Sequence, residues 1–304
     1  MKSTIETFNY QEPWLRSAFH NGKSAIDSLF IADILGTGWS SPWDIWTSLK
    51  TFVPAPMLRE QLNSRLQWTP MLRKQYEQRS NRSVDLEWRR IHHPKHDWCT
   101  ASILGLTEDP LTNTTGGLLF TMSTDPEAWL EDGSIIEKWT LVLPPNIAME
   151  AYWMMFCSQL PWIDITVGFP SNTSYLEIRI IRIFADERLQ QNLWTSAKAW
   201  RENHLLNNVI PSIDASRSCT SYLMERFAHG TDALREATDK EEAVLTQYEE
   251  VSEQLRELQA RQQLLRNELF RQIGHFAGLK RKDGNTAVLQ RNRNGLQLRV
   301  KRAS

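Results

Sequence analysis

The distribution of tryptophan divides this chain into two parts of different kind. All 13 tryptophans lie between Trp14 and Trp200, and none follows in the remaining residues. A tryptophan side chain buries a large apolar area and is costly to leave exposed. We therefore predict that residues 1–224 form a globular domain that holds the main hydrophobic core.

The segment after this domain is patterned as one long helix. Residues 233–273 are rich in Glu, Gln, Leu and Arg and contain neither Gly nor Pro. Apolar residues recur there at alternating spacings of four and three, interrupted only by Gln262; they are Tyr248, Val251, Leu255, Leu258, Leu265 and Leu269. This is the heptad spacing of a coiled coil. Residues 225–274 are predicted to be a heptad-patterned helix that stops at Gly274 and packs either on its own domain or on another chain.

Residues 275–304 are predicted to form a basic β-hairpin tail. Residues 286–290 and 296–301 have strand character and flank Asn294-Gly295, a strong hairpin signal. The tail carries eight cations and one acid, Asp283; the cations are Lys280, Arg281, Lys282, Arg291, Arg293, Arg299, Lys301 and Arg302. Clustered cations of this kind are typical of a surface that contacts DNA phosphates, although a merely solvated hairpin is an equal alternative.

The formal net charge of −1 is an average over the whole chain and does not reveal this basic tail. Taken over the whole chain, 35 basic and 36 acidic residues argue against a uniformly basic nucleic-acid binder. The first 274 residues, however, hold 27 basic and 35 acidic residues, so that an acidic body is joined to a basic end. Near neutrality therefore does not exclude nucleic acid as a partner.

Alternating and apolar runs in the first domain predict an α/β (α+β) fold, with helices flanking a mixed sheet. Residues 84–90, 162–169 and 175–180 alternate between apolar and polar side chains, which indicates half-buried strands. Further strands are expected near residue 100 and, as a more apolar run, over residues 135–143. Helices are expected over residues 145–159, which open at a proline pair, and over residues 187–203.

Cysteine usage and hydropathy favour a soluble, cytoplasmic protein. Cys99, Cys157 and Cys219 are odd in number and widely separated, which fits a reducing compartment better than a disulfide framework. The start of the chain has no signal-peptide core, and the most apolar stretch, residues 149–160, is too short to span a bilayer. No membrane partner is expected. His92, His93, His96 and Asp97 lie in a short loop and are interpreted as turn residues rather than as a metal site.

Four features follow one another in an order that resembles a known family. The first is residues 31–36 (IADILG), followed by Ser41-Pro42 and a helix with Trp46 and Lys50; the second is a helix from Pro70 to Tyr76, followed by strand 84–90 and His93-Pro94. The third is strand 135–139 and a helix with Tyr152-Trp153, and the fourth is the charged helix 239–273 with its basic hairpin. Together they are similar to the YqaJ-type viral recombinase exonucleases, from about residue 27 to the end of the chain.

The resemblance implies a PD-(D/E)XK nuclease-like fold and a Mg²⁺-dependent deoxyribonuclease site. In that family a helix Glu, a strand Asp and the carboxylate of a Glu-x-Lys pair supply oxygen ligands to Mg²⁺. The metal lowers the pKa of a bound water, the Lys orients that water, and a Gln lies on the next helix.

Carried over to this sequence, most of these positions lack the required side chain. The Glu position falls on Thr69, the Asp position on Leu104 and the Gln position on Ala151. If Glu137 is the carboxylate, the Lys position is Trp139; if Lys138 is the lysine, the carboxylate position is Ile136. Adjacent strand residues face opposite sides, so Glu137 and Lys138 cannot serve one metal together without a bulge.

We therefore predict a phage-type DNA recombination protein that is a pseudonuclease. It would keep Glu137 and Lys138 as remnants, need no cofactor, and bind double-stranded DNA or DNA ends through the tail and an inherited cleft. It would act as a homo-oligomer or beside an active recombination partner.

Two other functions are compatible with the sequence. The first is an active Mg²⁺-dependent exonuclease with rearranged ligands, drawn from Asp97, Glu108, Asp109, Asp125, Glu127, Asp132 and Glu137. Most of these lie in residues 106–133, which have the composition of an insertion. The second is a protein-interaction module that uses the long helix to occupy a host or phage factor.

Overall fold

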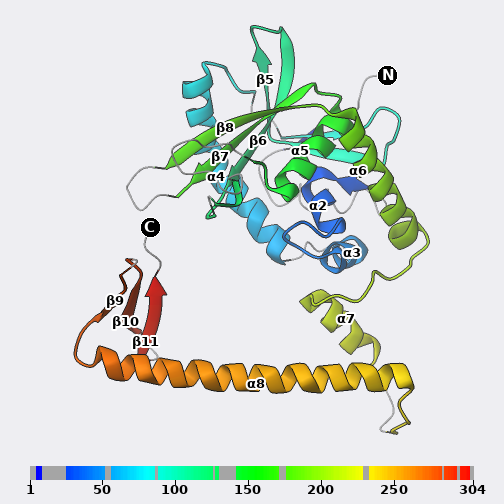
Figure 1. Cartoon of the computed structure of the whole chain (residues 1–304). Helices are drawn as coiled ribbons and strands as arrows, with labels where there is room; N and C mark the ends of the chain where they lie inside the picture. The colour runs from blue at the N-terminus through cyan, green and yellow to red at the C-terminus, as the bar shows by residue number, and fades with distance from the viewer. Residues whose placement is uncertain are drawn as a thin grey trace. The chain divides into compact units, whose positions relative to one another are not determined.

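Helices pack around two four-stranded sheets in residues 1–229, and residues 230–304 form a separate unit (Figure 1). In this computed structural model the described residues are 5–8, 25–51, 56–85, 88–125, 127–129, 142–170, 176–228, 233–282, 284–292 and 295–301. The predicted α/β class, with helices flanking mixed sheets, is confirmed.

The first sheet has the strand order β1-β3-β4-β2. Its strands are β1 (Ile5–Phe8), β3 (Trp88–His92), β4 (Cys99–Ile103) and the short β2 (Ile26–Asp27), which runs parallel to β4. The alternation over residues 84–90 predicted a strand slightly too early, because Asp85 makes only an isolated bridge to Leu106. After β2 the chain turns through a 3₁₀ turn, η1 (Ser28–Phe30), into the short helix α2 (Ile31–Ile34).

The second sheet has the order β5-β6-β7-β8. Its strands are β5 (Gly105–Asp109), β6 (Thr114–Met122), β7 (Trp162–Phe169) and β8 (Glu177–Phe184). Strands β6 and β7 are parallel, and a parallel pair needs a long crossover. Helix α5 (Pro145–Ser158) lies within this crossover, which confirms the helix predicted over residues 145–159.

Two predictions about this sheet need correction. Residues 106–133 are not simply an insertion, because they contain most of β5 and all of β6. Their high content of Gly and Thr is typical of loops. In the sheet, however, Gly116 leaves room for the ring of Trp162, because a Cβ at this position would lie 2.1 Å from that ring. The strand expected over residues 135–143 falls mostly outside the described residues, and residues 142–143 are not strand. The described strand that precedes α5 is β6.

Strand β7 is buried on both faces, so the prediction of a half-buried strand is wrong here. All eight of its residues are buried, because β7 is a central strand that contacts both α4 (Pro56–Ser80) and α5. Helix α4 also packs against β6 and β8. The polar side of the alternation, which includes Asp164 and Thr166, therefore lies inside the protein.

The remaining helices of this unit are α3 (Pro42–Thr51), α6 (Glu187–Trp200) and α7 (Arg217–Arg226). A single 3₁₀ turn, η2 (Glu127–Trp129), precedes α5, and a π-helical segment, η3 (Arg201–Leu206), extends α6. Helices α3 and α7 meet through Trp43, Trp46 and Tyr222, whose ring centroids lie 5.2 to 5.4 Å apart. All three cysteines are buried free thiols, as interpreted for Cys99 and Cys157.

The second unit consists of the long helix α8 (Asp239–Ile273) and a three-stranded sheet (Figure 1). A capping box between Thr238 and Glu241 starts the helix, so the predicted start at residue 225 is too early, and Gly274, with φ +56°, ends it as predicted. Residues 217–226 belong to α7, and residues 233–238 are not helical. The sheet has the order β11-β10-β9, made of β9 (Gly278–Lys280), β10 (Thr286–Asn292) and β11 (Gly295–Lys301). Asn292 pairs with Gly295, so Gly295, which was predicted to lie between the strands, is the first residue of β11, and residues 293–294 lie outside the described residues.

Among the helices that the structure describes, none combines the length and the apolar composition that crossing a membrane requires.

Candidate functional site

A buried ion pair joins helix α4 to helix α5. The two terminal nitrogens of Arg65 bond the two carboxylate oxygens of Glu150 at 2.5 and 2.7 Å. The side chains are only 14% and 7% exposed. Burial by itself would lower the pKa of the Arg65 guanidinium, but the charge and hydrogen bonds of Glu150 outweigh it and raise that pKa. Paired in this two-pronged geometry, the guanidinium is a permanent cation between the helices.

Asp33 of α2 is a second carboxyl group beside this pair. Its Oδ1 accepts a hydrogen bond from the Ser40 amide at 2.6 Å, and its side chain is buried. Gly38 allows the loop to close over it, because a Cβ there would lie 2.2 Å from the same Oδ1. Burial, and to a smaller extent the charge of Glu150, raise the pKa of Asp33 to about 7. Near neutral pH this carboxyl group therefore exchanges a proton.

Thr69 and Ala151, which the resemblance places at the Glu and Gln positions of a nuclease site, flank the ion pair. Thr69 is buried one helical turn after Arg65, and its hydroxyl donates a hydrogen bond to the Arg65 carbonyl at 2.7 Å. Ala151 directly follows Glu150 and lies in the hydrophobic core. The side chains around these two positions thus supply one fixed guanidinium and two carboxyl groups, one of which titrates near pH 7.

A second buried network links α4 to the second sheet. Arg182 of β8 bonds Asp164 of β7 at 2.7 and 2.8 Å and also contacts Asp109 of β5. Arg82 bonds Asp109 at 2.9 Å, and the Tyr76 hydroxyl donates to Asp164 at 2.6 Å. Hydrogen bonding from Arg182 holds the pKa of Asp109 below its usual value. Because both carboxylates are already held by guanidinium groups, this network is best suited to fixing β5, β7, β8 and α4 together.

The loop that contains His92, His93, His96 and Asp97 forms a hydrogen-bonded turn, as interpreted from the sequence. Nδ1 of His93 accepts hydrogen bonds from the amides of Lys95 and His96, both at 3.1 Å. The His93 ring stacks on Phe156 of α5, with centroids 4.4 Å apart. Burial, helped by the charges of His96 and Lys95, lowers the pKa of His93 to about 4. His93 is therefore neutral near pH 7 and accepts hydrogen bonds inside the turn.

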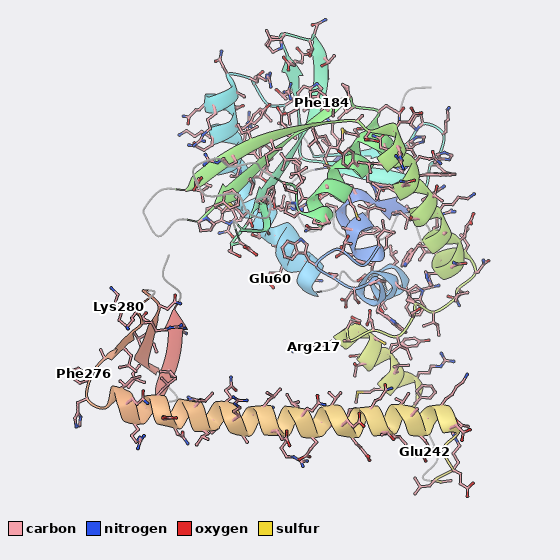
Figure 2. The ribbon with its side chains drawn as sticks, in the orientation of Figure 1. Glu60, Phe184, Arg217, Glu242, Phe276 and Lys280 are labelled. Atoms are coloured by element: carbon pink, nitrogen blue, oxygen red, sulfur yellow. The ribbon has the colours of Figure 1, made fainter. Side chains whose placement is uncertain are left out.

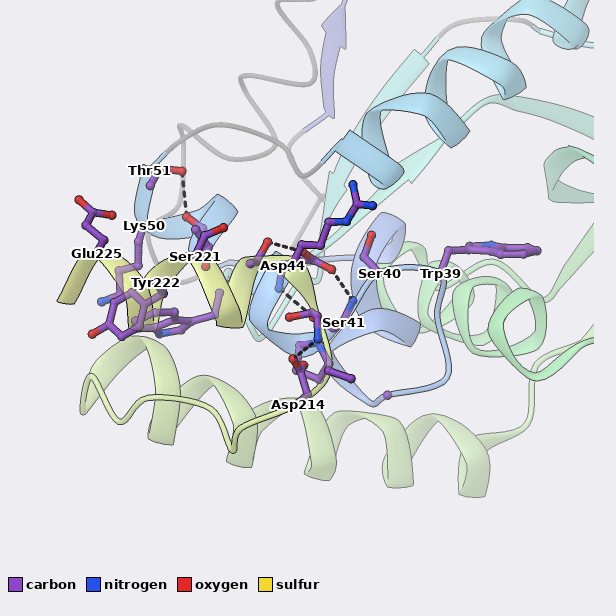
Figure 3. A pocket seen from close by; sticks show the side chains of 18 residues that line it. Trp39, Ser40, Ser41, Asp44, Lys50, Thr51, Asp214, Ser221, Tyr222 and Glu225 are labelled. Atoms are coloured by element: carbon purple, nitrogen blue, oxygen red, sulfur yellow. Dashed lines mark hydrogen bonds between the residues drawn. The ribbon is translucent and has the colours of Figure 1, made fainter. Parts of the chain in front are cut away.

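A cavity of about 1240 Å³ lies where α3 and α7 begin (Figure 3). Figure 3 shows Asp44, Ser41 and Asp214 near one another on its wall. Ser41 and Asp44 cap α3 reciprocally, at 2.9 and 3.1 Å, and Asp214 accepts from the Ser216 amide at 2.9 Å. Asp44 thus caps the start of α3, and Asp214 bonds the residue that caps α7, while the other oxygen of Asp214, Oδ2, is buried without a hydrogen-bond partner.

In the second unit, strand register gathers cations on one face of the sheet. Thr286 of β10 pairs with Lys280 on one side and Lys301 on the other, and Val288 pairs with Gly278 and Arg299. Alternate residues of a strand face the same side, so positions 280, 299 and 301 share a face. Lys280, Arg299 and the turn residues Arg281 and Lys282 are exposed. We call these four exposed residues, two on this face and two directly after β9, the basic face.

The other residues predicted from the sequence lie in several places. Leu104 is buried in the core between β4 and β5, Asp97, Glu108 and Asp125 are exposed, and Asp109 belongs to the arginine network. Outside the described residues lie Asp132, Glu137, Lys138, Trp139, Arg293 and Arg302. The side chains of Glu127, Arg291 and Lys301 are also outside the description. Within the described part of the chain, no three His, Cys, Asp or Glu side chains are grouped so as to hold a metal.

Sequence reasoning did not identify Asp33, Arg65 or the arginine network. Glu150 and Asp164 carry the signal that could have found them, because each is a charged residue inside an apolar segment. A carboxylate in such a place is buried, and a buried carboxylate needs a partner. The partners themselves, Arg65 and Arg182, have no distinguishing local pattern.

Comparison with known proteins finds similarity among solved structures. No protein-family model matches the chain, and no curated protein matches it. An alkaline exonuclease, LHK-Exo from Laribacter hongkongensis, is similar over 72% of this chain and 98% of its own, with 16% identity and a TM-score of 0.49. The same exonuclease in complex with dAMP gives 17% identity, the same coverage and a TM-score of 0.48. A protein designated SSO0001 is similar over 62% of this chain and 85% of its own, with 10% identity and a TM-score of 0.33.

Replacing Arg65 by Met should destabilise the first unit by about 3–5 kcal/mol, because Glu150 is then buried without its partner. The double variant Arg65→Met/Glu150→Met should recover most of this loss. Urea unfolding followed by tryptophan fluorescence measures both values. As a control, Lys198→Met breaks the half-exposed pair with Glu202 and should cost under about 1 kcal/mol. A similarly small cost for Arg65→Met would contradict a structural role for the buried pair.

Asp33→Asn should change how stability depends on pH. The folded-state pKa of Asp33 is raised, so its stabilising protonated form is complete below about pH 4 and is lost as pH rises through about 7. The free energy of unfolding of the unmodified chain should therefore fall relative to Asp33→Asn between pH 4 and pH 8, by up to about 4 kcal/mol. Urea unfolding at intervals of one pH unit tests this. Parallel curves for the two proteins would show that Asp33 does not titrate in this range.

Proposed function

We propose that this chain is a DNA-binding recombination protein with a YqaJ-like nuclease fold and a metal site replaced by an ion pair. As such a pseudonuclease, it binds double-stranded DNA or DNA ends, or serves as an inert subunit beside an active partner. The observation that carries the proposal is the Arg65–Glu150 pair, which lies between the two helices where the resemblance expects catalytic side chains.

The order of elements supports the nuclease-like part of this proposal. The resemblance expects a helix that carries a metal ligand, a carboxylate-bearing strand and then a crossover helix. Helix α4 precedes helix α5 in the chain, and β6 and β7 are parallel neighbours. The carboxylate-bearing strand is expected at residues 135–139, between these two helices, and lies outside the described residues.

The side chains at the inherited positions support the loss of metal chemistry. Thr69 is engaged with the helix backbone, and Leu104 and Ala151 are core residues. A guanidinium keeps its proton and does not coordinate water, so it cannot activate a nucleophile as Mg²⁺ does. It can neutralise Glu150, and this stabilises the fold.

The basic face supports DNA as the partner. Its four cations are exposed, and three of them, Lys280, Arg281 and Lys282, are consecutive. Cations that neutralise phosphates release bound counterions, and this supplies affinity without reading sequence. A protein that binds DNA ends, or an accessory subunit, requires only such sequence-independent affinity.

A 5′-labelled duplex incubated with the protein and Mg²⁺ or Mn²⁺ should remain intact. The reason is that no water-activating metal site is expected between α4 and α5. Gel electrophoresis over several hours measures the remaining full-length strand. Degradation that disappears in Glu137→Ala would overturn the proposal in favour of an active exonuclease with rearranged ligands.

Duplex binding should weaken steeply as salt rises, and the triple variant Lys280→Gln/Arg281→Gln/Lys282→Gln should flatten this dependence. If all three cations contact phosphates, the slope of log K against log salt should fall in magnitude by about 2.7. Fluorescence anisotropy with a labelled duplex measures it. The control Arg188→Gln/Lys198→Gln removes two exposed cations of α6 and should leave the slope unchanged. Absence of duplex binding even at low salt would favour a protein-interaction module instead.

A further inference from the structure

Most of the heptad seam of α8 is exposed among the described residues of its own unit. We define the seam as Val244, Tyr248, Val251, Leu255, Leu258 and Leu265, with Gln262 and Leu269 in the same rows. The first six are 52% to 72% exposed, and Ile273 is the one buried residue of this helix. Figure 2 shows side chains projecting along α8 between Glu242, near its start, and Phe276, just beyond its end. The three-stranded sheet follows the end of the helix and leaves the seam uncovered.

A helix of this length and pattern needs a packing partner. Its 35 residues extend over roughly 50 Å. Helix propensity alone stabilises isolated helices only marginally, and most helical stability in proteins comes from burying an apolar face. A seam at alternating spacings of four and three fits the holes of another helix with the same repeat. A second α8 has this repeat over the full length.

We propose that α8 forms an antiparallel two-stranded coiled coil with α8 of a second copy of this chain. Charge selects the direction. Residues 239–256 carry six acids and two bases, whereas residues 257–273 carry two acids and three bases. Antiparallel pairing sets the acidic half of each helix against the basic half of the other, which is favourable, whereas parallel pairing aligns the two acidic halves.

The residues at the e and g positions beside the seam also favour antiparallel pairing. With Leu255 at position a and Leu258 at position d, Arg261 falls at position g and Arg266 at position e. In a parallel dimer, g of one helix faces the following e of the other, so Arg261 would meet Arg266 of its partner. Antiparallel pairing instead brings Arg261 near Gln254 of the partner and avoids this repulsion.

When two antiparallel α8 helices overlap over their full length, apolar seam residues of one helix lie opposite apolar seam residues of the other. Leu255 then lies opposite Leu258 of the partner, Tyr248 opposite its Leu265, and Val244 opposite its Leu269. Gln262 lies opposite Val251 of the partner, and a single polar residue in a seam restricts register at some cost in stability. The two ends of the helix overlap completely in this register, so no apolar seam position is left over.

The mass of the full-length chain in solution tests the association. Light scattering after size exclusion should give twice 35.4 kDa. Leu255→Lys/Leu258→Lys should reduce this to 35.4 kDa, and the matched control Thr246→Lys/Ala260→Lys, on the opposite face of α8, should remain a dimer. Tryptophan fluorescence, which reports on the first unit alone, should be unchanged in both variants. A monomer for the unmodified chain, or a trimer, would overturn the proposal.

Disulfide trapping tests the direction. The native cysteines are buried, so a cysteine introduced on α8 is the reactive one. Antiparallel pairing puts Tyr248 next to Leu265 of the partner, while the two copies of Tyr248 lie about 25 Å apart. A mixture of Tyr248→Cys and Leu265→Cys chains should therefore form a covalent dimer under oxidation, and Tyr248→Cys alone should not. Efficient cross-linking of Tyr248→Cys alone would establish a parallel pair and overturn the antiparallel assignment.

Discussion

Charge that is buried inside the first unit has to be neutralised there, and this requirement connects most of its elements. Asp164 lies in a strand that is buried on both faces, and Arg182 and Tyr76 reach it from β8 and α4. Glu150 lies in an apolar helix and is held by Arg65 from α4. Each unpaired buried ion would cost several kcal/mol. Helix α4 is therefore held in place at two points by charge as well as by packing.

The same requirement shapes the cluster between α4 and α5. The Arg65 guanidinium is a permanent cation of the chain and is bound to both carboxylate oxygens of Glu150. Thr69 and Ala151 lie next to this pair and are buried. Asp33, with its pKa near 7, leaves the cluster able to gain or lose one proton at physiological pH.

The second unit distributes its charge and apolar area differently. Four exposed cations lie on the small sheet and directly after β9, and apolar residues form an exposed seam along α8. Among the described residues of the first unit, Glu150, Asp164 and Asp109 are paired within the unit, while the basic face and the seam of the second unit are exposed. An antiparallel pair of α8 helices would carry one three-stranded sheet at each end, about one helix length apart.

Local signals predicted a large part of this structure. Helix α8, its end at Gly274, the basic hairpin, helix α5 and strand β7 all follow from periodicity, proline and glycine. Strands β5 and β6 were missed because their glycines and threonines are typical of loops, and the need for Gly116 appears only when Trp162 packs on it. The burial of β7 was missed because alternation cannot show that a second layer covers its polar side.

By itself, the sequence determined the division into a tryptophan-rich body, a heptad helix and a basic end, because composition and periodicity are properties of neighbouring residues. Only the tertiary structure decided that Arg65 meets Glu150 and that Arg182 meets Asp164 and Asp109. These partners come from different helices and strands, and Arg65 and Glu150 are 85 residues apart. Which carboxylates are held by arginine depends on how those elements pack, and no local pattern encodes it.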